Sequence, residues 1–406
     1  MNLTAQELFP GLIESLPPER AVRVKNILER FFTKTLTRMA DGLPFIITGD
    51  IPAMWLRDST WQVAPFFSSK HPEIAELLAD LSLAQQKYFL IDPYANAFNP
   101  TASGACWDKD FADQSPWVWE RKYELDSWAS VLFLARKVKE CWGITRQYEG
   151  TFGKVLNHMI ELARREQRHD ADSYLFYRDN GVPHDSLSNG GKGAPVGYTG
   201  MIFSAFRPSD DACTYGYLIP SNLFFLNELK LLPSDFRPDD LIAEIEDGIA
   251  RFATTDQGYA YEVDGLGNSL FIDDANIPSL LSLPYLGVCA ADDPIYLKTR
   301  AHILSTENPH FYQTDVATGI GSQHTPRDHI WPIAIAVEGL TRIDSLSVDD
   351  VLIALESTDA GTGLMHESFH KDDPKIYTRE WFSWADAMYL EVILKSFKAM
   401  RSAVNG

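Results

Sequence analysis

Two neighbouring residues in an early segment of the chain, Arg57 and Asp58, have the chemistry to bind a sugar. They follow Trp55 within residues 48–60 (TGDIPAMWLRDST), which carry few other charges. An arginine supplies donors in a fixed geometry and an aspartate accepts charge-assisted bonds, so the pair can hold the hydroxyl groups of one sugar ring. A structural ion pair, or a helix cap at Asp58, is the alternative, and the spacing leaves both open.

A second polar group consists of Arg207 and the run Ser209-Asp210-Asp211, which precedes a predicted helix. An acid that protonates a leaving oxygen near neutral pH needs a raised pKa, and burial can supply it. Aspartate is also common at helix starts. The two carboxylates are therefore either a site where one acid is tuned or caps on a loop.

The segment His366-Glu367-Ser-Phe-His370 matches the H-E-x-x-H pattern of zinc peptidases. That mechanism needs both histidines on one face of a regular helix, with a third ligand from elsewhere. Gly361 and Gly363 lie just upstream and residues 371–374 (KDDP) just downstream, which leaves little room for such a helix. The pattern therefore favours Glu367 working without a metal, and zinc bound by His366 and His370 stays an alternative.

Two further segments carry candidate ligand contacts. His324 lies in residues 319–326 (GIGSQHTP), where glycines let the backbone approach a ligand. Glu380 and its neighbour Arg379 stand beside Trp381 near the start of the last predicted helix. Each group could hold a sugar or simply brace its own loop. We take His324 and Glu380, together with Trp55 and Arg207, as candidate substrate contacts.

Other clustered acids have simpler interpretations. Glu120, Glu124 and Asp126 surround a helix start, where acids usually serve as dipole partners or ion pairs. Asp273 and Asp274 lack the D-x-D-x-D-G spacing of a calcium loop. Neither cluster predicts a metal or a cofactor.

Helices must position these segments, because strand-like alternation is confined to short stretches such as Phe45–Thr48 and Tyr259–Val263. Helical periodicity covers residues 18–39, 72–90, 122–141, 152–166, 220–232, 239–253, 296–304, 329–342, 347–357 and 384–401. About a dozen helices joined by long loops rich in Gly, Pro, Asp and Trp predict an all-α fold, an (α/α)6 toroid with functional loops on one face. We expect one catalytic domain over residues 1–406.

Composition narrows the possible partners. The formal charge of −20 disfavours nucleic acid and membrane surfaces, because both are recognised through clustered Lys and Arg. The four cysteines show no C-x-x-C spacing and indicate free thiols in a reducing compartment. With no apparent signal sequence or membrane span, we predict a cytoplasmic protein of unknown oligomeric state.

The loop strings resemble glycoside hydrolase family 125, the metal-independent exo-α-1,6-mannosidases. The similar strings are TGDIPAMWLRDST, IDPYANAFN, SPWVWERKYELDS, FRPSDDACTYGYLIPSN, DDANIPSLLSLPYLG, GIGSQHTP, DAGTGLMHESFH and YTREWFSWA, which together span about residues 45 to 390. One departure is Asp386, where the resemblance leads us to expect Asn. The extra acid puts any pH optimum taken from relatives in doubt.

The resemblance implies an inverting hydrolase that removes terminal mannose from α-1,6-linked mannosides, such as N-glycan fragments, without a metal or cofactor. It implies that Asp210 is the general acid, that Glu367 is the general base, and that Arg57 and Asp58 hold the terminal mannose. Inversion requires the two carboxyl groups to lie roughly 6.5–9.5 Å apart, with water between. A glucoamylase-like exo-glycosidase, the zinc peptidase and a glycan-binding module without activity are the competing hypotheses.

Overall fold

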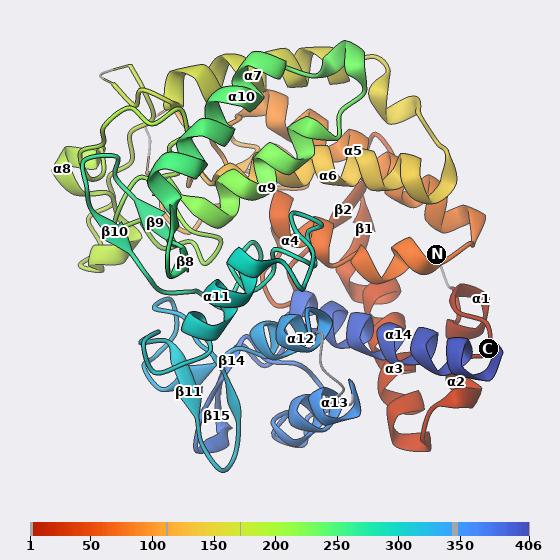
Figure 1. Ribbon diagram of the computed structural model, residues 1–406. Coiled ribbons are helices and arrows are strands. Elements are labelled where there is room, and N and C mark those ends of the chain that lie inside the picture. The colour runs from red at the N-terminus through yellow and green to blue at the C-terminus, as the bar shows by residue number, and fades with distance from the viewer. Residues whose placement is uncertain (1–2, 111–112, 171, 343–347, 406) are drawn as a thin grey trace.

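The computed structural model describes residues 3–405 apart from 111–112, 171 and 343–347, and within these residues helices dominate (Figure 1). The longer helices follow the predicted ranges, although the first residue of the range predicted at 347–357 lies outside the described part. They are α3 (Pro18–Arg30), α5 (Pro72–Ile91), α6 (Leu125–Trp142), α7 (Phe152–Glu166), α9 (Ile219–Lys230), α10 (Asp239–Gly248), α11 (Pro294–Ile303), α12 (Pro332–Leu340), α13 (Val348–Ser357) and α14 (Ser383–Asn405).

Helices that lie next to one another in the fold form two groups (Figure 1). In the first, α5 packs on α6 and α6 on α9, while α9 also contacts α10. In the second, α12, α13 and α14 pack on one another. Short α4 (Leu56–Trp61) lies between the groups and contacts both α6 and α14. The loops around α8 (Ser188–Gly191), β10 (Ser269–Leu270) and β15 (Asp373–Thr378) gather at the left of Figure 1, away from both termini.

The first predicted helix ends early. After α3 the chain makes a π-helical turn over Phe31–Thr35, and β1 (Leu36–Arg38) then pairs antiparallel with β2 (Pro44–Ile46). Threonines at 33, 35 and 37 favour extended backbone over helix, and Gly42 lies in the turn between the strands. The prediction that residues 18–39 are all helical is therefore wrong at its end.

Helix α4 lies inside residues 42–62, which we expected to be a loop. All its residues, Leu56–Trp61, are buried. A helix that is covered on every side shows no alternation of apolar and polar residues, so periodicity cannot reveal it. Its burial places Arg57 and Asp58 in the interior of the protein.

Many short strands join the long loops to one another. One sheet has the order β3 (Met54–Trp55), β4 (Ala97–Phe98) and β5 (Val118–Glu120), and another the order β13 (His329–Ile330), β14 (Ser368–His370) and β15. A third joins β6 (Tyr217–Leu218), β9 (Glu262–Val263) and β10. The predicted strand at 259–263 is split between β8 (Gly258–Tyr259) and β9. These ladders fix loops that come from distant parts of the sequence.

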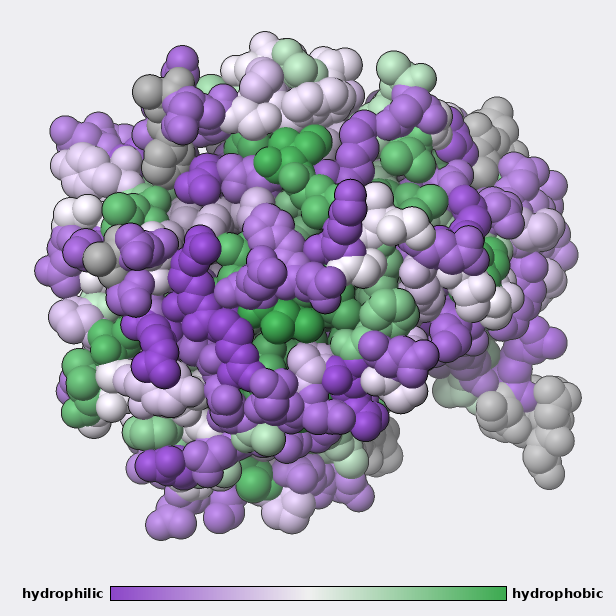
Figure 2. Space-filling view, turned by 90° about the horizontal axis from the view of Figure 1, so that it is seen from above, coloured by the Kyte–Doolittle hydropathy of each residue, from purple (hydrophilic) through white to green (hydrophobic). Residues whose placement is uncertain are grey.

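The interior is aromatic and the surface is polar. Trp61, Trp128, Trp331 and Trp384 are among the largest fully buried side chains. Hydrophilic residues cover most of the face in Figure 2, with hydrophobic residues visible mainly between them. All four cysteines are free, as predicted. No helix in the described residues has the length and apolar character needed to cross a membrane.

Candidate active site

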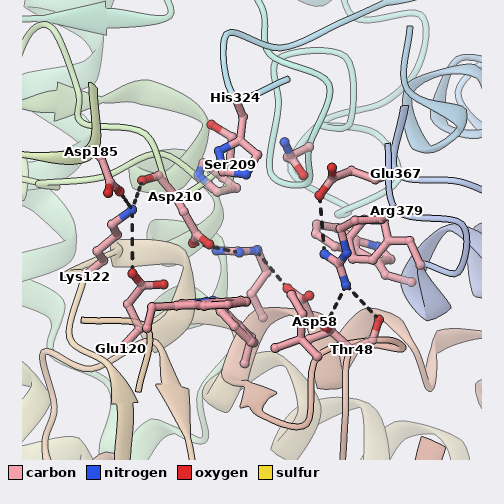
Figure 3. Close-up of a pocket in the computed structure, with 18 of the residues that line it drawn as sticks. Thr48, Asp58, Glu120, Lys122, Asp185, Ser209, Asp210, His324, Glu367 and Arg379 are labelled. Carbon is pink, nitrogen blue, oxygen red and sulfur yellow. Dashed lines mark hydrogen bonds and ion pairs between the residues drawn. The ribbon is translucent and has the colours of Figure 1, made fainter. Parts of the chain in front are cut away.

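A cavity of about 500 Å³ brings together loops that are far apart in the sequence. Its lining residues lie within segments 48–58, 107–122, 178–185, 208–210, 324–331 and 367–384, with Asn276 in addition. The volume is typical of a small-molecule site. Figure 3 shows carboxylates and cations facing each other across this space. Of the predicted site residues, the cavity contains Trp55, Arg57, Asp58, Asp210, His324 and Glu367.

Arg57 is almost completely buried and its guanidinium contacts several carboxyl groups. Nη1 lies 2.5 Å from Oε2 of Glu124 and 3.3 Å from Oδ2 of Asp126. Nη2 lies 3.5 Å from Oδ1 of Asp210, and Nε lies 3.3 Å from Oδ1 of Asp58. The guanidinium nitrogens of Arg57 therefore mainly contact these carboxyl groups. Arg57 holds the acids in place and has few donors left for a sugar.

Asp58 offers the cavity an acceptor. It lies in the first turn of α4, and its Oδ1 has no hydrogen-bond donor among the described residues. Burial raises the pKa of Asp58 to about 6. The negative charge of Asp210 adds to this rise, and the positive charge of Arg57 opposes it. The Oδ1 atom is buried and lies 3.3 Å from Nε of Arg57, but the Asp58 carboxylate lines the cavity and can accept a hydrogen bond from a ligand hydroxyl group.

Asp210 is held in an unusual backbone conformation. Its φ of 68° lies in the left-handed region, which Asp enters more readily than most residues with a side chain. The Nδ2 of Asn96 donates to Oδ1 of Asp210 at 3.1 Å, and Nζ of Lys122 donates to its backbone oxygen at 2.7 Å. Its own N–H donates to the backbone oxygen of Arg207 at 2.9 Å. Such strained conformations cluster at active sites, where the surroundings enforce them.

The charge state of Asp210 depends on its neighbour Glu124. Burial alone would raise the pKa of Asp210, but a hydrogen bond with Glu124 and the charges of Arg57, Lys122 and His324 lower it to about 2. Burial raises the pKa of Glu124 well above its usual value, with a further contribution from Asp210. Burial by itself thus does not give Asp210 the raised pKa that we expected of an acid, because the cations around its carboxyl group outweigh the effect of burial.

Glu367 is held by Arg379. The Nη1 of Arg379 lies 3.3 Å from Oε1 of Glu367, while its Nη2 lies 2.6 Å from Oδ1 of Asp50 and 3.0 Å from Oγ1 of Thr48 (Figure 3). Arg379 also has a left-handed backbone, with φ of 41°. Fixed at several atoms, the guanidinium holds the carboxylate of Glu367 in one orientation at the cavity wall.

His324 adds a positive charge to the cavity. Its Nδ1 lies 3.3 Å from Oδ1 of Asp211. Burial lowers the pKa of His324, but the hydrogen bond to Asp211 and the charges of Asp211, Glu367 and Asp210 raise it to about 9. With 35% of its side chain exposed, the ring can still contact a ligand.

Lys122 occupies another wall. Its ammonium group pairs with Asp185 and lies 3.8 Å from Oε1 of Glu120 (Figure 3). The Nη2 of Arg178 donates to the same Glu120 oxygen at 2.9 Å. This wall therefore presents both donors and acceptors, which suits a neutral ligand with many hydroxyl groups.

The histidines of the H-E-x-x-H pattern cannot form a zinc site of the peptidase type. The ring of His366 stacks on Tyr377 at 3.8 Å, and its two nitrogens face the backbone oxygens of Glu380 and Asp359. His370 lies in strand β14, and residues four apart in extended chain are separated by roughly 13 Å. No group of three or more ligand side chains suited to a metal occurs in the described residues. The zinc-peptidase hypothesis is therefore wrong.

Two predicted contacts lie outside the cavity. The Nε of buried Arg207 donates to Oε1 of Glu262 at 2.6 Å. The side chain of Glu380 is exposed and accepts a hydrogen bond from the hydroxyl group of Tyr377 at 3.4 Å. The chain turns at Arg379, whose φ is 41°, and the cavity receives Arg379 and not Glu380.

Asp386 also lies outside the cavity, behind the segment that carries Glu367. Its Oδ1 accepts the backbone N–H of Met365 at 3.0 Å, and its Oδ2 lies 3.2 Å from Nη1 of Arg30. Burial raises the pKa of Asp386 to about 6, although the Met365 N–H and the charge of Arg30 oppose the shift. Asp386 thus anchors the backbone two residues before Glu367.

Sequence reasoning missed several residues of the site. Asn96, Lys122 and Glu124 lie in or beside the predicted helix and loops without any distinctive spacing, and Glu124 was interpreted as an ordinary ion-pair partner. Arg379 is the residue that the sequence could have indicated as a ligand contact, because it stands among aromatic residues next to Glu380. The others come together through contacts between segments that the sequence separates widely.

Comparison with known proteins agrees with this geometry. The family described as metal-independent α-mannosidases, GH125, matches residues 19–394. A meiotically up-regulated gene 157 protein of Schizosaccharomyces pombe is 36% identical over 388 residues, which cover 86% of this chain and 76% of that protein.

Solved structures point the same way. A metal-independent α-mannosidase of Streptococcus pneumoniae, in a non-productive complex with α-1,6-mannobiose, is 41% identical with a TM-score of 0.91 and 96% of each chain covered. A bacterial glucoamylase bound to acarbose is 13% identical, with a TM-score of 0.54. The match covers 85% of this chain and 49% of the glucoamylase, and it shows a shared fold alone. These matches confirm the predicted (α/α)6 fold, and the chain belongs to the GH125 family of metal-independent α-mannosidases.

Proposed function

We propose that the protein is an exo-acting α-1,6-mannosidase that releases terminal mannose with inversion at the anomeric carbon. Asp210 acts as the general acid and Glu367 as the general base. The observation that carries this proposal is that both carboxylates line one cavity and face it from different sides (Figure 3). The α-1,6-mannobiose bound in the Streptococcus pneumoniae relative supports the choice of substrate.

The reaction begins with a water molecule between Glu367 and the sugar. Glu367 removes a proton from this water while its oxygen bonds to the anomeric carbon. The bond to the leaving oxygen breaks at the same time, and Asp210 delivers a proton to that oxygen. Arg379 keeps Glu367 oriented for this step.

The terminal mannose contacts the residues between the two carboxylates. The carboxylate of Asp58 accepts a hydrogen bond from a mannose hydroxyl group, and Trp55 and His324 complete this part of the lining. Arg57 fixes Asp58 and Asp210 relative to each other. Mannose-containing oligosaccharides, including N-glycan fragments, are the proposed substrates.

Proton NMR of α-1,6-mannobiose hydrolysis in excess EDTA tests the proposal. We expect β-mannose as the first product, followed by mutarotation, and no inhibition by the chelator. Asp210→Ala and Glu367→Ala should each lower the rate by about 100-fold or more. A second assay compares an α-mannoside with the matching α-glucoside. Cleavage of the mannoside alone distinguishes this activity from that of a glucoamylase. Initial α-mannose would contradict inversion and the role of Glu367.

A further inference from the structure

Trp107 differs from the other tryptophans that line the cavity because its side chain faces solvent. Trp107 is 57% exposed, whereas Trp55, Trp331 and Trp384 are each at most 4% exposed. Single exposed apolar side chains are common on protein surfaces. This one borders a cavity with charged walls, where a bound ligand can cover it.

The segment that carries Trp107 is fixed to the body of the protein. The Nε and Nη2 of Arg178 donate to the two carboxylate oxygens of Asp110, each at 2.8 Å. The rings of Trp107 and Trp119 pack edge to face, with centroids 5.5 Å apart and an interplanar angle of 80°. A perpendicular contact covers at most one face of a ring. At least one face of the Trp107 indole is therefore free of Trp119, on a segment that is already positioned.

A series of contacts joins this segment to the proposed acid. The same Arg178 that holds Asp110 donates to Oε1 of Glu120 at 2.9 Å. The Nζ of Lys122 lies 3.8 Å from that oxygen and donates to the backbone oxygen of Asp210 at 2.7 Å. Trp107 thus belongs to the wall of the cavity that includes Asp210.

The wall of Asp210 is the one that meets the leaving part of a substrate. In Figure 3, Asp210 and Lys122 lie on one side of the cavity, and Glu367 lies on the other. An inverting enzyme holds its water at the base and its leaving oxygen at the acid, on opposite faces of the terminal sugar. The sugar that leaves must therefore lie on the side of Asp210, within reach of Trp107.

The chemistry of this wall suits a second pyranose ring. A tryptophan offers a large apolar face, against which the C–H groups of one face of a sugar can pack. The carboxylate of Asp108 and the ammonium group of Lys122 line the same cavity and can bond to the hydroxyl groups at the ring edge. An apolar surface flanked by donors and acceptors matches a sugar better than a purely apolar leaving group.

We propose that Trp107 stacks on the sugar next to the terminal mannose and makes the enzyme specific for saccharides over small leaving groups. Trp107 would contact the leaving sugar and take part in no proton transfer. The inference rests on the proposed function, because the role of Asp210 as general acid decides which side the leaving sugar occupies.

Two substrates that share the terminal mannose test this role. In α-1,6-mannobiose the leaving group is a sugar, whereas in α-mannosyl fluoride it is a single atom that offers no ring for Trp107 to stack on. The variants are Trp107→Ala, which removes the stacking surface, and Trp107→Phe, which keeps an aromatic face. Tyr198→Ala is the matched control, because Tyr198 is an aromatic residue that is 51% exposed and lies outside the cavity.

We expect Trp107→Ala to lower kcat/KM for mannobiose by about 5- to 10-fold, mainly through a higher KM, and to leave the fluoride within about 2-fold. Trp107→Phe should recover at least about half of the wild-type value for mannobiose. Tyr198→Ala should stay within about 2-fold on both substrates. Equal losses on the two substrates, or wild-type kinetics of Trp107→Ala on mannobiose, would overturn the inference.

The wild type separates this inference from the proposed function. If the wild type releases β-mannose from mannobiose and Trp107→Ala does not discriminate between the substrates, the role of Trp107 fails alone. If the wild type does not cleave mannobiose, the proposed function fails and the inference falls with it. Should thermal melting show that Trp107→Ala is poorly folded, Asp110→Asn weakens the pair with Arg178 that holds the segment. It should show the same selective loss, and an equal loss on both substrates would again contradict the proposal.

Discussion

The guanidinium of Arg379 lies 3.3 Å from the carboxylate of Glu367, and the arginine adopts a left-handed backbone conformation to reach it. Asp50 and Thr48 hold the same guanidinium on its other side. The cation is therefore fixed before any substrate arrives. This arrangement makes the orientation of Glu367 depend on a residue that has no chemical step of its own.

Arg379→Gln should lower kcat/KM for mannobiose by about 10- to 100-fold. Glu367 loses the guanidinium that orients its carboxylate, so the loss should appear mainly in kcat. The measurement is kcat and KM of the variant beside the wild type. Arg178→Gln removes an arginine from a wall that Glu367 does not share, and its effect should appear mainly in KM. A wild-type kcat in Arg379→Gln would count against the role of this pair.

Asp58→Asn should weaken the hold on the terminal sugar. A charge-assisted hydrogen bond contributes about 1.5–3 kcal/mol, which corresponds to a loss of about 10- to 150-fold in kcat/KM. Mannobiose and mannosyl fluoride should suffer alike, since both place the same ring beside Asp58. The test is steady-state kinetics on the two substrates. Thermal melting verifies that the variant is folded. Wild-type kcat/KM would show that Asp58 serves Arg57 alone.

Asp386→Asn should change the pH dependence of stability. The pKa of Asp386 is raised to about 6 in the folded protein, so Asp386 ionises at lower pH when the chain is unfolded. Ionisation between about pH 4 and about pH 6 therefore favours the unfolded state, and the wild type loses up to about 3 kcal/mol across this window. Asparagine cannot ionise, so the variant should gain stability relative to the wild type as pH rises.

Denaturant unfolding at about pH 4 and about pH 7 measures this difference. Asp349→Asn is a suitable control, because Asp349 is 60% exposed and pairs with Arg20 at the surface. Its effect should stay within about 0.5 kcal/mol at both values. A difference for Asp386→Asn that does not change with pH would mean that its carboxyl group titrates alike in both states.

His370→Ala should leave mannosidase activity within about 2-fold of the wild type, with or without EDTA. The histidine sits in strand β14, where its ring packs 5.6 Å from that of His329. It does not line the cavity, so its loss removes no group that touches substrate. Kinetics before and after dialysis against the chelator make the comparison. Strong inactivation by EDTA would show that a metal takes part after all.

Most of the fold follows from local patterns in the chain. Helices such as α5 and α7 carry enough apolar residues at helical spacing, with Pro72 at the start of one, for their limits to be predicted closely. Helix α4 and the short strands escaped prediction. A fully buried helix of this length and strands of two or three residues are stabilised by contacts with distant segments and leave no periodic trace.

Residue types that can do the chemistry were visible in the sequence, and their arrangement was not. Asp210 and Glu367 were identified through motif strings, whereas Arg207 was selected as a neighbour of the Ser209–Asp211 run and Glu380 as part of the group with Arg379 and Trp381. Proximity in the chain misled at both positions, because the backbone turns at Asp210 and at Arg379. Arg379 and Lys122 reach the site through turns and strand pairing that no local pattern encodes.

The sequence by itself determined where the long helices lie and which carboxylates the loops carry, and its negative charge disfavours polyanionic partners. Only the tertiary structure decided that Arg57 contacts four acids, that Arg379 and not Glu380 meets Glu367, and that Asn96 contacts both Glu124 and Asp210. Helix formation depends on neighbours a few residues apart. The charge state of a buried acid depends on burial and on every charge nearby, and both exist only after the chain has folded.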